Sequence, residues 1–345
     1  MSPRTNIAIY GASGHTGRLV ARELAARGRE VVLAGRDGGK LKALADELGG
    51  AQVRQVALDD ERGLRELAGE AGVLVHCAGP FTHTGRQVAR AAADGGCHYV
   101  DHALEQHHTA WMFDEMGPRA RAAGITMVTA MSFYGGLGDL LAGAVAAGMS
   151  GIERVTVAYA VSDWMLTAGA KSTAELLFAD TRRITYTGGA FHVGDLEPRN
   201  AVYPFPPPLG PRTMIAPIPS SDVVTIPRHV RAGRVEAQLT ADTFTDERAF
   251  TSEHVDAATR AGSRFTVAVQ VVTADGNRAG QAAGHDLWRE SALASVEAAV
   301  RLVDAEAGGG GPGPGVYGPA EAFAAEPFLR DLERLGLFTL TLPTS

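Results

Sequence analysis

Short apolar runs separated by helical patterns fill roughly the first 130 residues of the chain. Each run is bounded by glycine or polar residues and has the length of a buried strand. The runs lie at residues 6–10, 29–35, 52–58, 72–78, 97–101 and 124–130. Because strands alternate with helices, the pattern predicts an α/β domain with a doubly wound parallel sheet of the Rossmann type, which we place at residues 1–150.

The pattern changes beyond this domain, where strands follow one another with few helices between them. A helix over 139–149 leads into this part, and a proline run at 204–208 is predicted to be a loop. Strands are expected at 154–161, 223–226, 235–240, 265–272 and 279–285, and helices at 172–181 and 291–306. An Asp-Gly turn joins the last two strands as a hairpin. We therefore predict a second, α+β domain with an open, largely antiparallel sheet over 151–286, and a C-terminal segment over 287–345.

The turn between the first strand and the first helix contains three regularly spaced glycines. The first permits a tight turn, the second lets the backbone approach a pyrophosphate, and the third lets the helix pack closely on the strand. The N–H groups at the start of the helix then face the anion. The predicted dinucleotide contacts are Gly11, Ser13, Gly14, His15, Thr16 and Gly17. The spacing is one residue longer than in G-x-G-x-x-G, and the alternative is an ordinary strand-to-helix turn.

The end of the second strand indicates which dinucleotide is bound. An acidic residue at this position accepts a hydrogen bond from the 2′-hydroxyl of NAD, whereas an arginine suits the 2′-phosphate of NADP. Arg36 occupies the position, and Lys40 follows one helical turn later. We therefore predict NADPH/NADP+ as the cofactor. The alternative is a solvated arginine whose charge Asp37 partly offsets.

Two further segments are predicted to contact the cofactor. Asp59 follows the third strand and can accept a hydrogen bond from adenine, although capping of the next helix also explains an acidic residue there. The loop after the fourth strand lies at the carboxyl edge of the sheet, where the ligand crevice of a doubly wound fold forms. Its predicted contacts are Ala78, Gly79, Pro80 and Phe81.

Charge and composition exclude several other classes of protein. A net charge of −7 and a pI near 5.9 argue against a nucleic-acid partner, which requires a basic surface. No apolar run reaches the length of a membrane span and no signal-peptide pattern precedes the first strand, so we expect a cytoplasmic protein without a membrane partner. The two cysteines, Cys77 and Cys97, do not make a disulfide framework.

A set of segments distributed over the chain points to a known family. The set comprises the glycine turn with Arg36, residues 78–81, residues 96–101 with Glu105, and residues 315–323 followed by Phe328-Leu329. In these segments the chain resembles the saccharopine dehydrogenase (saccharopine reductase) superfamily, which includes trans-acting enoyl reductases. The resemblance implies an NADP-binding domain, reduction of C=N or C=C bonds with NADPH, and C-terminal helices that return to the first domain. Residues 132–139 depart from the family, which usually has a Pro-Gly-Phe-type loop there, and this leaves the substrate open.

Three other kinds of chemistry are disfavoured by the residues present. No tyrosine is followed four positions later by a lysine, so the Tyr-x-x-x-Lys pair of short-chain dehydrogenases is absent. His15 stands where a G-x-S-x-G nucleophile elbow needs glycine. The histidines between residues 98 and 108 lie partly on a strand and partly after it, so their spacing specifies no shared face and we predict no metal site.

The proton donor of a reductase has three candidates in the sequence. His102 ends the fifth strand at the ligand edge of the sheet. Tyr134 lies where the sixth strand gives way to the second domain, and Lys171 follows the first strand of that domain. We predict these three as catalytic residues, although a helix N-terminal position accounts equally for the lysine.

Substrate contacts are expected near the same junction between the domains. Asp139 lies there and can equally cap the following helix. Trp164 and Met165 would form an apolar wall, with core packing as the alternative for the tryptophan.

These observations together predict an NADPH-dependent oxidoreductase that reduces a C=N or C=C bond of a small biosynthetic intermediate by hydride transfer. The nicotinamide is expected near Gly79-Pro80 on the first domain, and the small-molecule substrate on the second. The alternatives are a non-catalytic NADP(H)-binding regulator, a ketoreductase, and a scaffold that binds no nucleotide. A homodimer through the sheet of the second domain is the oligomer that this architecture allows.

Overall fold

A computed structural model of the chain describes residues 4–244, 255–308 and 311–343. The chain folds into two compact units, each made of segments that are not consecutive in sequence. Unit 1 consists of Met1–Ala103, His107–Ser132 and Ser291–Tyr317, and unit 2 of Leu104–Gln106, Phe133–Glu290 and Gly318–Ser345. The segment after residue 286 is therefore shared between the units.

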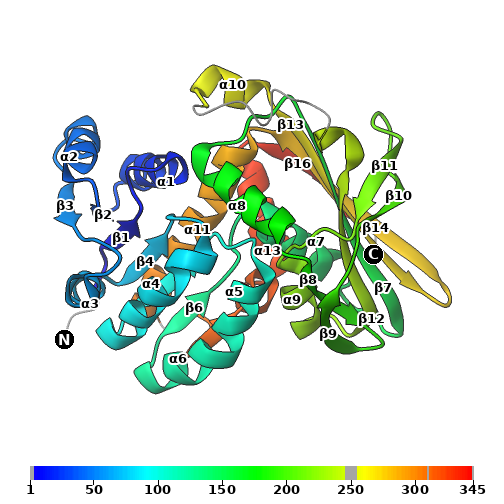
Figure 1. The fold of residues 1–345 in the computed structure, drawn as a ribbon, viewed down its shortest axis with the longest axis horizontal. Coiled ribbons are helices and arrows are strands. Elements are labelled where there is room, and N and C mark those ends of the chain that lie inside the picture. The colour runs from blue at the N-terminus through cyan, green and yellow to red at the C-terminus, as the bar shows by residue number, and fades with distance from the viewer. Residues whose placement is uncertain (1–3, 245–254, 309–310, 344–345) are drawn as a thin grey trace. The chain divides into compact units, whose positions relative to one another are not determined.

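Unit 1 is built on a seven-stranded parallel sheet with the strand order β15-β6-β5-β4-β1-β2-β3 (Figure 1). The strands are β1 (Ile7–Tyr10), β2 (Val31–Gly35), β3 (Gln52–Gln55), β4 (Val73–His76), β5 (His98–Asp101), β6 (Thr126–Val128) and β15 (Gly315–Tyr317). The six predicted strands and the Rossmann-type arrangement are confirmed. The seventh strand, β15, was not predicted; it comes from the far end of the chain and pairs with β6.

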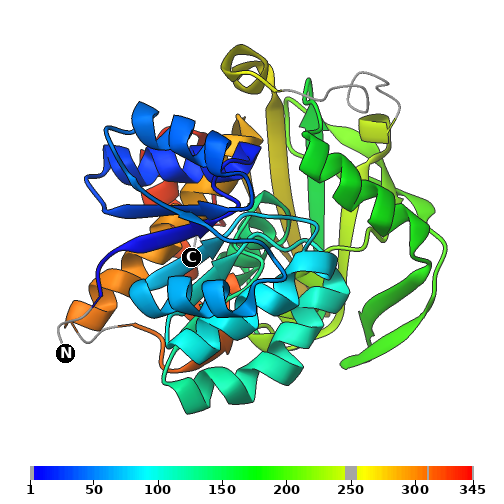
Figure 2. The ribbon, with the colours of Figure 1, turned by 60° about the vertical axis from the view of Figure 1, so that its left-hand side comes forward.

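Helices cover both faces of this sheet, so the central strands are buried throughout. The helices are α1 (His15–Ala26), α2 (Gly38–Glu47), α3 (Glu61–Glu70), α4 (Phe81–Gly95), α5 (Gln106–Trp111), η1 (Met112–Met116), α6 (Gly117–Ala123) and α11 (Leu287–Gly308). An ion pair of 3.0 Å between Arg27 and Glu297 joins the end of α1 to α11, which runs along the sheet on the same face (Figure 2).

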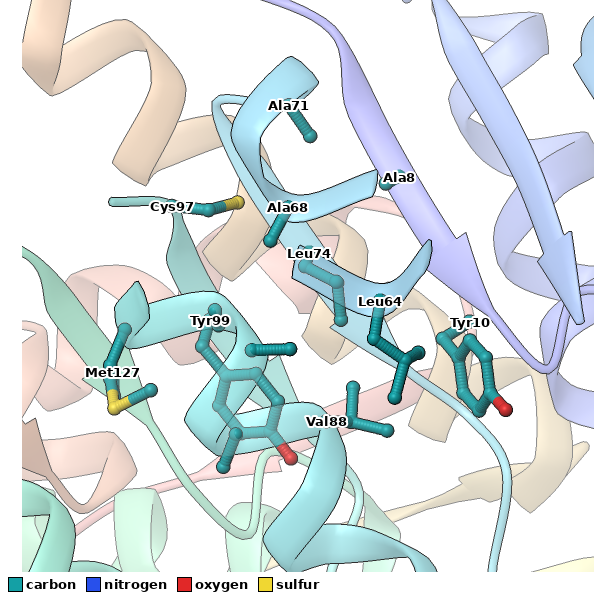
Figure 3. Packing of buried hydrophobic residues seen from close by; sticks show 14 of the residues in the cluster. Ala8, Tyr10, Leu64, Ala68, Ala71, Leu74, Val88, Cys97, Tyr99 and Met127 are labelled. Atoms are coloured by element: carbon teal, nitrogen blue, oxygen red, sulfur yellow. The ribbon is translucent and has the colours of Figure 1, made fainter. Parts of the chain in front are cut away.

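The opposite face of the sheet packs on α3 and α4. Leu64 of α3 and Val88 of α4 lie beside Leu74 of β4, and Tyr99 of β5 extends the same layer (Figure 3). All four side chains are at most 1% exposed. The periodic apolar residues of the two helices therefore form the core that holds the ends of β4 and β5 in place.

Unit 2 is built on a nine-stranded mixed sheet with the strand order β10-β11-β12-β7-β13-β14-β16, to which β8 adds through β12, and β9 through β8. The strands are β7 (Ile152–Ser162), β8 (Arg182–Thr187), β9 (Ala190–Asp195), β10 (Arg199–Pro204), β11 (Pro211–Ala216), β12 (Ala232–Thr240), β13 (Arg264–Thr273), β14 (Gly276–His285) and β16 (Phe338–Thr341). Among the described strands of this second sheet, only β12 and β7 pair in parallel. The predicted open, largely antiparallel sheet is confirmed.

The helical segments of unit 2 include several that the sequence pattern did not locate. They are η2 (Phe133–Leu137), α7 (Gly138–Val145), α8 (Ala168–Ala179), α9 (Asp222–Thr225), η3 (Ile226–Arg228), η4 (Ala241–Phe244), α10 (Ala257–Gly262), α12 (Pro319–Ala322) and α13 (Ala325–Arg334). The predicted strand at 223–226 is wrong, because these residues form the helical turns α9 and η3. A four-residue apolar run fits a buried strand and a buried helical turn equally well.

The predicted hairpin after β13 is confirmed. Thr273 pairs with Gly276, so the turn contains the two residues Ala274 and Asp275 between the strands. Among the described residues, no helix combines the length and apolar character that crossing a bilayer requires.

Candidate functional site

The glycine turn of unit 1 is shaped by two close backbone approaches. Gly11 has φ +85°, and a Cβ added there would come within 2.8 Å of the Ala78 backbone nitrogen at the end of β4. A Cβ on Gly17 would clash with the Gly11 carbonyl oxygen and lie 2.7 Å from the Ala12 Cα. Two of the three glycines are therefore required by the protein's own packing, which brings the turn and the β4 loop together at one edge of the sheet.

The Gly14 position leaves the start of α1 open to a ligand. Gly14 is the N-cap of α1, and no side chain caps the helix or places a negative charge in its first turn. The first intrahelical bond runs from the Arg18 N–H to the Gly14 carbonyl, at 3.0 Å. The backbone N–H groups ahead of it have no acceptor within the helix, so they form a site suited to a phosphate.

Gly17→Ala tests the close packing of this turn. The added methyl must displace backbone atoms of residues 11 and 12, so the free energy of unfolding is expected to fall by about 1–3 kcal/mol. Chemical denaturation measures the change. Gly14→Ala is the matched control, because its Cβ would meet only the Gly11 carbonyl oxygen, at 3.2 Å. Equal stability losses in the two variants would contradict the packing argument.

Arg36 is an exposed arginine at the carboxyl end of β2 whose charge is not neutralised by its neighbour. The Asp37 carboxylate caps α2, accepting from the Lys40 N–H at 3.0 Å, and lies 3.5 Å from the Lys40 ammonium. The Arg36 guanidinium makes no hydrogen bond or ion pair with another described residue. Lys40, predicted to help bind phosphate, is thus partly engaged by Asp37, whereas Arg36 is available to an anion.

Two acidic residues after β3 have separate roles. Asp60 is the N-cap of α3 and accepts from the Gly63 N–H at 2.9 Å, so the capping role falls to it and not to Asp59. Burial raises the pKa of Tyr10, the positive charge of Arg36 lowers it, and Asp59 raises it. Arg36 and Asp59 therefore both act on the Tyr10 hydroxyl at the end of β1. The cofactor contact predicted for Asp59 stays a prediction.

The loop after β4 is held by one hydroxyl group. Thr84 Oγ1 donates to the Ala78 carbonyl at 2.6 Å and lies 3.1 Å from the Pro80 carbonyl, which ties the loop to the first turn of α4. The Phe81 ring is buried and packs against the His76 ring, with centroids 4.9 Å apart. If Phe81 contacts a cofactor as predicted, its backbone must do so, because its side chain is part of the core.

Asp101, the last residue of β5, organises the adjoining loops. Its fully buried carboxylate accepts from the N–H groups of Ala103 and Ala130, the Thr129 hydroxyl and His108 Nε2, at 2.8 to 3.2 Å. Burial by itself would raise the pKa of Asp101, but these donors lower it to about 2. Asp101 therefore has a structural role, because it holds the turn after β5 and the segment after β6 to the end of its own strand.

His102 and His76 stand at the carboxyl ends of neighbouring strands and are both uncharged at neutral pH. Burial lowers the pKa of His102 to about 4 and that of His76 to about 3. His102 Nδ1 lies 3.3 Å from the Ser291 hydroxyl of α11, and His76 Nδ1 lies 3.0 Å from the Tyr99 hydroxyl. Sequence reasoning did not identify His76, Tyr99 or Ser291. His76 follows an apolar run that is typical of a core strand, and the contact of Ser291 with His102 joins residues far apart in the sequence.

In unit 2, Tyr134 lies in the irregular segment between β6 and α7. Its ring packs on those of Phe133 and Tyr159, with centroids 4.9 and 5.0 Å away. Burial of its hydroxyl raises the pKa of Tyr134 above its ordinary value. A phenol with a raised pKa releases its proton less readily, so the raised pKa does not support the role of proton donor that we predicted for Tyr134.

A fully buried polar cluster next to Tyr134 was not foreseen. The Tyr159 hydroxyl accepts from the Gly135 N–H and donates to the Asp222 carboxylate, each at 3.0 Å. The Ser220 hydroxyl also donates to Asp222. Burial raises the pKa of Asp222 to about 7 despite these donors. The cluster joins β7, α9 and the segment before α7.

Asp139 is also buried and engaged. Its carboxylate accepts from His229 Nε2 at 2.9 Å and from the Ala320 N–H at 2.7 Å. The N-cap of α7 is Leu137, so Asp139 does not cap that helix. The substrate contact predicted for it stays a prediction, and both oxygens already have donors.

The three predicted site residues in the segment after β7 differ in how deeply they are buried. Trp164 is buried and stacks on Trp288 with centroids 6.4 Å apart, and its indole Nε1 is buried without a hydrogen bond among the described residues. Met165 is half-buried. Lys171 is exposed in the first turn of α8, whose N-cap is Thr167. The roles predicted for these residues stay predictions.

Comparison with known proteins agrees with the geometry of unit 1. Residues 7–131 match the family model described as the saccharopine dehydrogenase NADP binding domain. The chain is 30% identical over 139 residues to a lipid droplet localized protein of Caenorhabditis elegans, covering 37% of this chain and 33% of the relative. It is 32% identical over 133 residues to a trans-acting enoyl reductase of Mycobacterium ulcerans, covering 37% and 32%. The matched segments span about a third of these relatives.

A solved structure shares the fold of the whole chain. Saccharopine dehydrogenase (L-Glu forming) from Saccharomyces cerevisiae superimposes with a TM-score of 0.64, covering 99% of this chain and 100% of that one, at 14% sequence identity. At this identity the likeness concerns the fold alone.

Proposed function

We propose that this chain is an NADPH-dependent oxidoreductase acting on a small molecule, on the basis of the match of residues 7–131 to the saccharopine dehydrogenase NADP binding domain. The specific reaction that we propose is reduction of a C=N or C=C bond. The observation that carries the proposal is the pairing of an uncapped α1 N-terminus with an unpaired Arg36 on the same sheet edge.

The residues of unit 1 fit this cofactor. The first turn of α1 supplies backbone N–H groups for the pyrophosphate, and Arg36 supplies a positive charge for the 2′-phosphate. NADPH, when bound, supplies the hydride. The chain contributes binding and orientation, and the loop of residues 78–81 lies at the carboxyl edge where the nicotinamide is expected.

The structure supports the cofactor assignment more than the choice of substrate. The family match covers residues 7–131. The substrate, its protonation and any homodimer concern the rest of the chain, and we state them as proposals. A homodimer would form through the unit 2 sheet, at β9. Among the described strands β9 pairs only with β8, and its Phe191 and Val193 are 49% and 52% exposed. The cytoplasmic location belongs to the same proposal.

Titration calorimetry with NADPH and NADH, followed by turnover assays, tests the proposed function. We expect NADPH to bind more tightly than NADH, and NADPH to be oxidised in the presence of a cyclic imine such as 1-pyrroline or of a 2-enoyl thioester. Binding without turnover on either class, or on ketones, would favour the NADP(H)-binding regulator. Turnover on ketones alone would favour the ketoreductase, and no nucleotide affinity would contradict the whole assignment.

A further inference from the structure

One ring nitrogen of His102 is buried without a hydrogen bond. His102 follows Asp101, the last residue of β5, and its Nδ1 lies 3.3 Å from the Ser291 hydroxyl of α11. The other ring nitrogen, Nε2, is buried and has no hydrogen-bond partner in the described part of the chain. His102 and Ser291 both belong to unit 1. Such groups are rare in folded proteins, because leaving a buried polar group unsatisfied is costly.

The His102 ring is neutral at pH 7. Burial lowers the pKa of His102 to about 4, although the neighbouring Asp101 carboxylate raises it. A neutral imidazole carries a hydrogen on only one of its two nitrogens. If the Ser291 hydroxyl donates to Nδ1, then Nε2 carries the hydrogen and needs an acceptor. If Nδ1 donates to Ser291, then Nε2 needs a donor. In both tautomers Nε2 has one hydrogen bond left to make.

His102 lies at the ligand edge of the parallel sheet, on the side away from the glycine turn. The strand order β6-β5-β4-β1-β2-β3 reverses direction between β4 and β1. In a doubly wound sheet the dinucleotide lies outside the carboxyl ends of the strands at this reversal, with one mononucleotide half on each side. The glycine turn and Arg36 belong to the β1-to-β3 side. The β4-to-β6 side, where His102 follows β5, is therefore the side of the nicotinamide half.

The end of the next strand carries a second feature typical of a ligand site. Ala130, two residues after β6, has φ +62°, a left-handed conformation that is uncommon for residues other than glycine. The Asp101 carboxylate holds this conformation by accepting from the Ala130 N–H at 2.8 Å. Strained backbone of this kind clusters at ligand sites. One buried carboxylate thus fixes the residues that follow both β5 and β6 at this edge.

His76, at the end of β4, also has a buried and unpartnered Nε2, but its surroundings differ. Its residue is fully buried, and the rings of Tyr10, Phe81 and Tyr99 have their centroids 5.7, 4.9 and 6.1 Å from its own. His76 is therefore part of an aromatic core. His102 is only half-buried as a residue, and its hydrogen bond with Ser291 is the contact that the described residues give its ring. Of these two histidines, His102 is the one that a ligand can reach.

We propose that Nε2 of His102 forms a hydrogen bond with the nicotinamide half of NADP(H), and that Ser291 fixes the ring for this contact. This role rests on the cofactor of the proposed function. The nicotinamide carboxamide and the hydroxyls of its ribose each offer a donor and an acceptor, so both can pair with Nε2 in either tautomer. The contact orients the nicotinamide end of the cofactor on unit 1.

His102→Leu tests this contact, with two nucleotides compared by titration calorimetry. NADP+ contains both halves of the cofactor, whereas 2′,5′-ADP contains the adenosine and the 2′-phosphate but no nicotinamide half. The Kd for NADP+ is expected to rise about 3- to 10-fold, the value of one neutral hydrogen bond, and the Kd for 2′,5′-ADP to stay the same. Unchanged binding of 2′,5′-ADP also shows that the variant is folded.

Two further variants separate the hydrogen bond from packing. His102→Gln places an amide group near the position of Nε2, so it should bind NADP+ more tightly than His102→Leu does. His107→Leu is the matched control, because His107 is an exposed histidine of α5 in the same unit. It should leave the Kd of both nucleotides unchanged.

Imidazole 15N NMR gives a readout that a purely structural role would not change. The Nε2 resonance of His102, identified by its absence from His102→Gln, should shift when NADP+ is added and keep its position with 2′,5′-ADP. Its chemical shift also reports the tautomer. A Ser291→Ala variant in which the tautomer is unchanged overturns the role of Ser291.

The outcomes separate this proposal from the cofactor assignment. If the wild type binds both nucleotides and His102→Leu has the same Kd for NADP+, the role of His102 is overturned and the cofactor assignment remains. Equal losses for NADP+ and 2′,5′-ADP would indicate a structural defect and also overturn that role. A wild type that binds neither nucleotide overturns the cofactor assignment and the role of His102 together.

Discussion

Replacing Asp101 by alanine is expected to lower the free energy of unfolding by about 4 kcal/mol, and chemical denaturation measures the change. The carboxylate is fully buried and accepts from the Ala103 and Ala130 N–H groups, the Thr129 hydroxyl and His108 Nε2. Truncation leaves these buried donors without an acceptor. Since they hold the ends of β5 and β6, we also expect weaker NADPH binding in the variant.

Asp101→Asn is the matched control for this prediction. The amide keeps the shape of the side chain and an oxygen acceptor for the Ala103 and Ala130 N–H groups, so it should lose less than half as much stability as the alanine variant. Equal losses in the two variants would show that the cost arises from the lost charge and not from the unsatisfied donors.

The same carboxylate predicts a pH dependence. Its folded pKa of about 2 lies below the ordinary value of 3.8, so the ionised group stabilises the fold above about pH 4. That contribution, about 2 kcal/mol, should disappear as the pH falls from about 4 to about 2. Urea unfolding at several pH values measures it, and an Asp101→Asn profile as steep as that of the wild type would contradict it.

Arg36→Asp is expected to weaken NADPH binding about 10- to 100-fold and to reverse the preference for NADPH over NADH. Hydrogen bonds to a charged group contribute about 1.5–3 kcal/mol, which corresponds to this loss. The aspartate would repel the 2′-phosphate of NADPH and accept from the 2′-hydroxyl of NADH. Titration calorimetry with both nucleotides gives the ratio of the two affinities.

Arg62→Asp provides the control for Arg36→Asp. Arg62 is an exposed arginine of α3, 3.2 Å from Glu66, and the substitution makes the same change in net charge away from the turn. It should leave the ratio of the two affinities unchanged. If both variants reduce NADPH binding equally, the effect is a general one of net charge, and the assignment of the 2′-phosphate to Arg36 is wrong.

The sequence located the glycine turn and the arginine beside it because their constraints are local. Gly11 and Gly17 are needed where the backbone turns and where the helix meets the strand, and residues a few positions apart decide both. The same applies to Arg36, which follows its strand directly. Local patterns also gave β1 to β6 and the β13–β14 hairpin, because alternation and turn chemistry act over a few residues.

The elements and contacts that the sequence analysis predicted wrongly or missed depend instead on the tertiary structure. The apolar run at 223–226 forms helical turns, since burial without periodicity does not distinguish a strand from a helix. The two hairpins β8–β9 and β10–β11 were missed. Asp222 and Glu290 are both acidic residues next to a serine in the sequence. Asp222 accepts from the hydroxyls of Tyr159 and Ser220, whereas Glu290 has no hydrogen-bond partner among the described residues.

The sequence by itself determined the class of fold, the glycine turn and the positive charge beside it, because each depends on residues close together in the chain. Only the tertiary structure decided that β15 completes the parallel sheet, that Asp60 takes the cap and leaves Asp59 exposed, and that Glu290 is buried without a partner. Those outcomes depend on pairings between distant segments and on the loss of water around each side chain. Neither is encoded in the local order of residues.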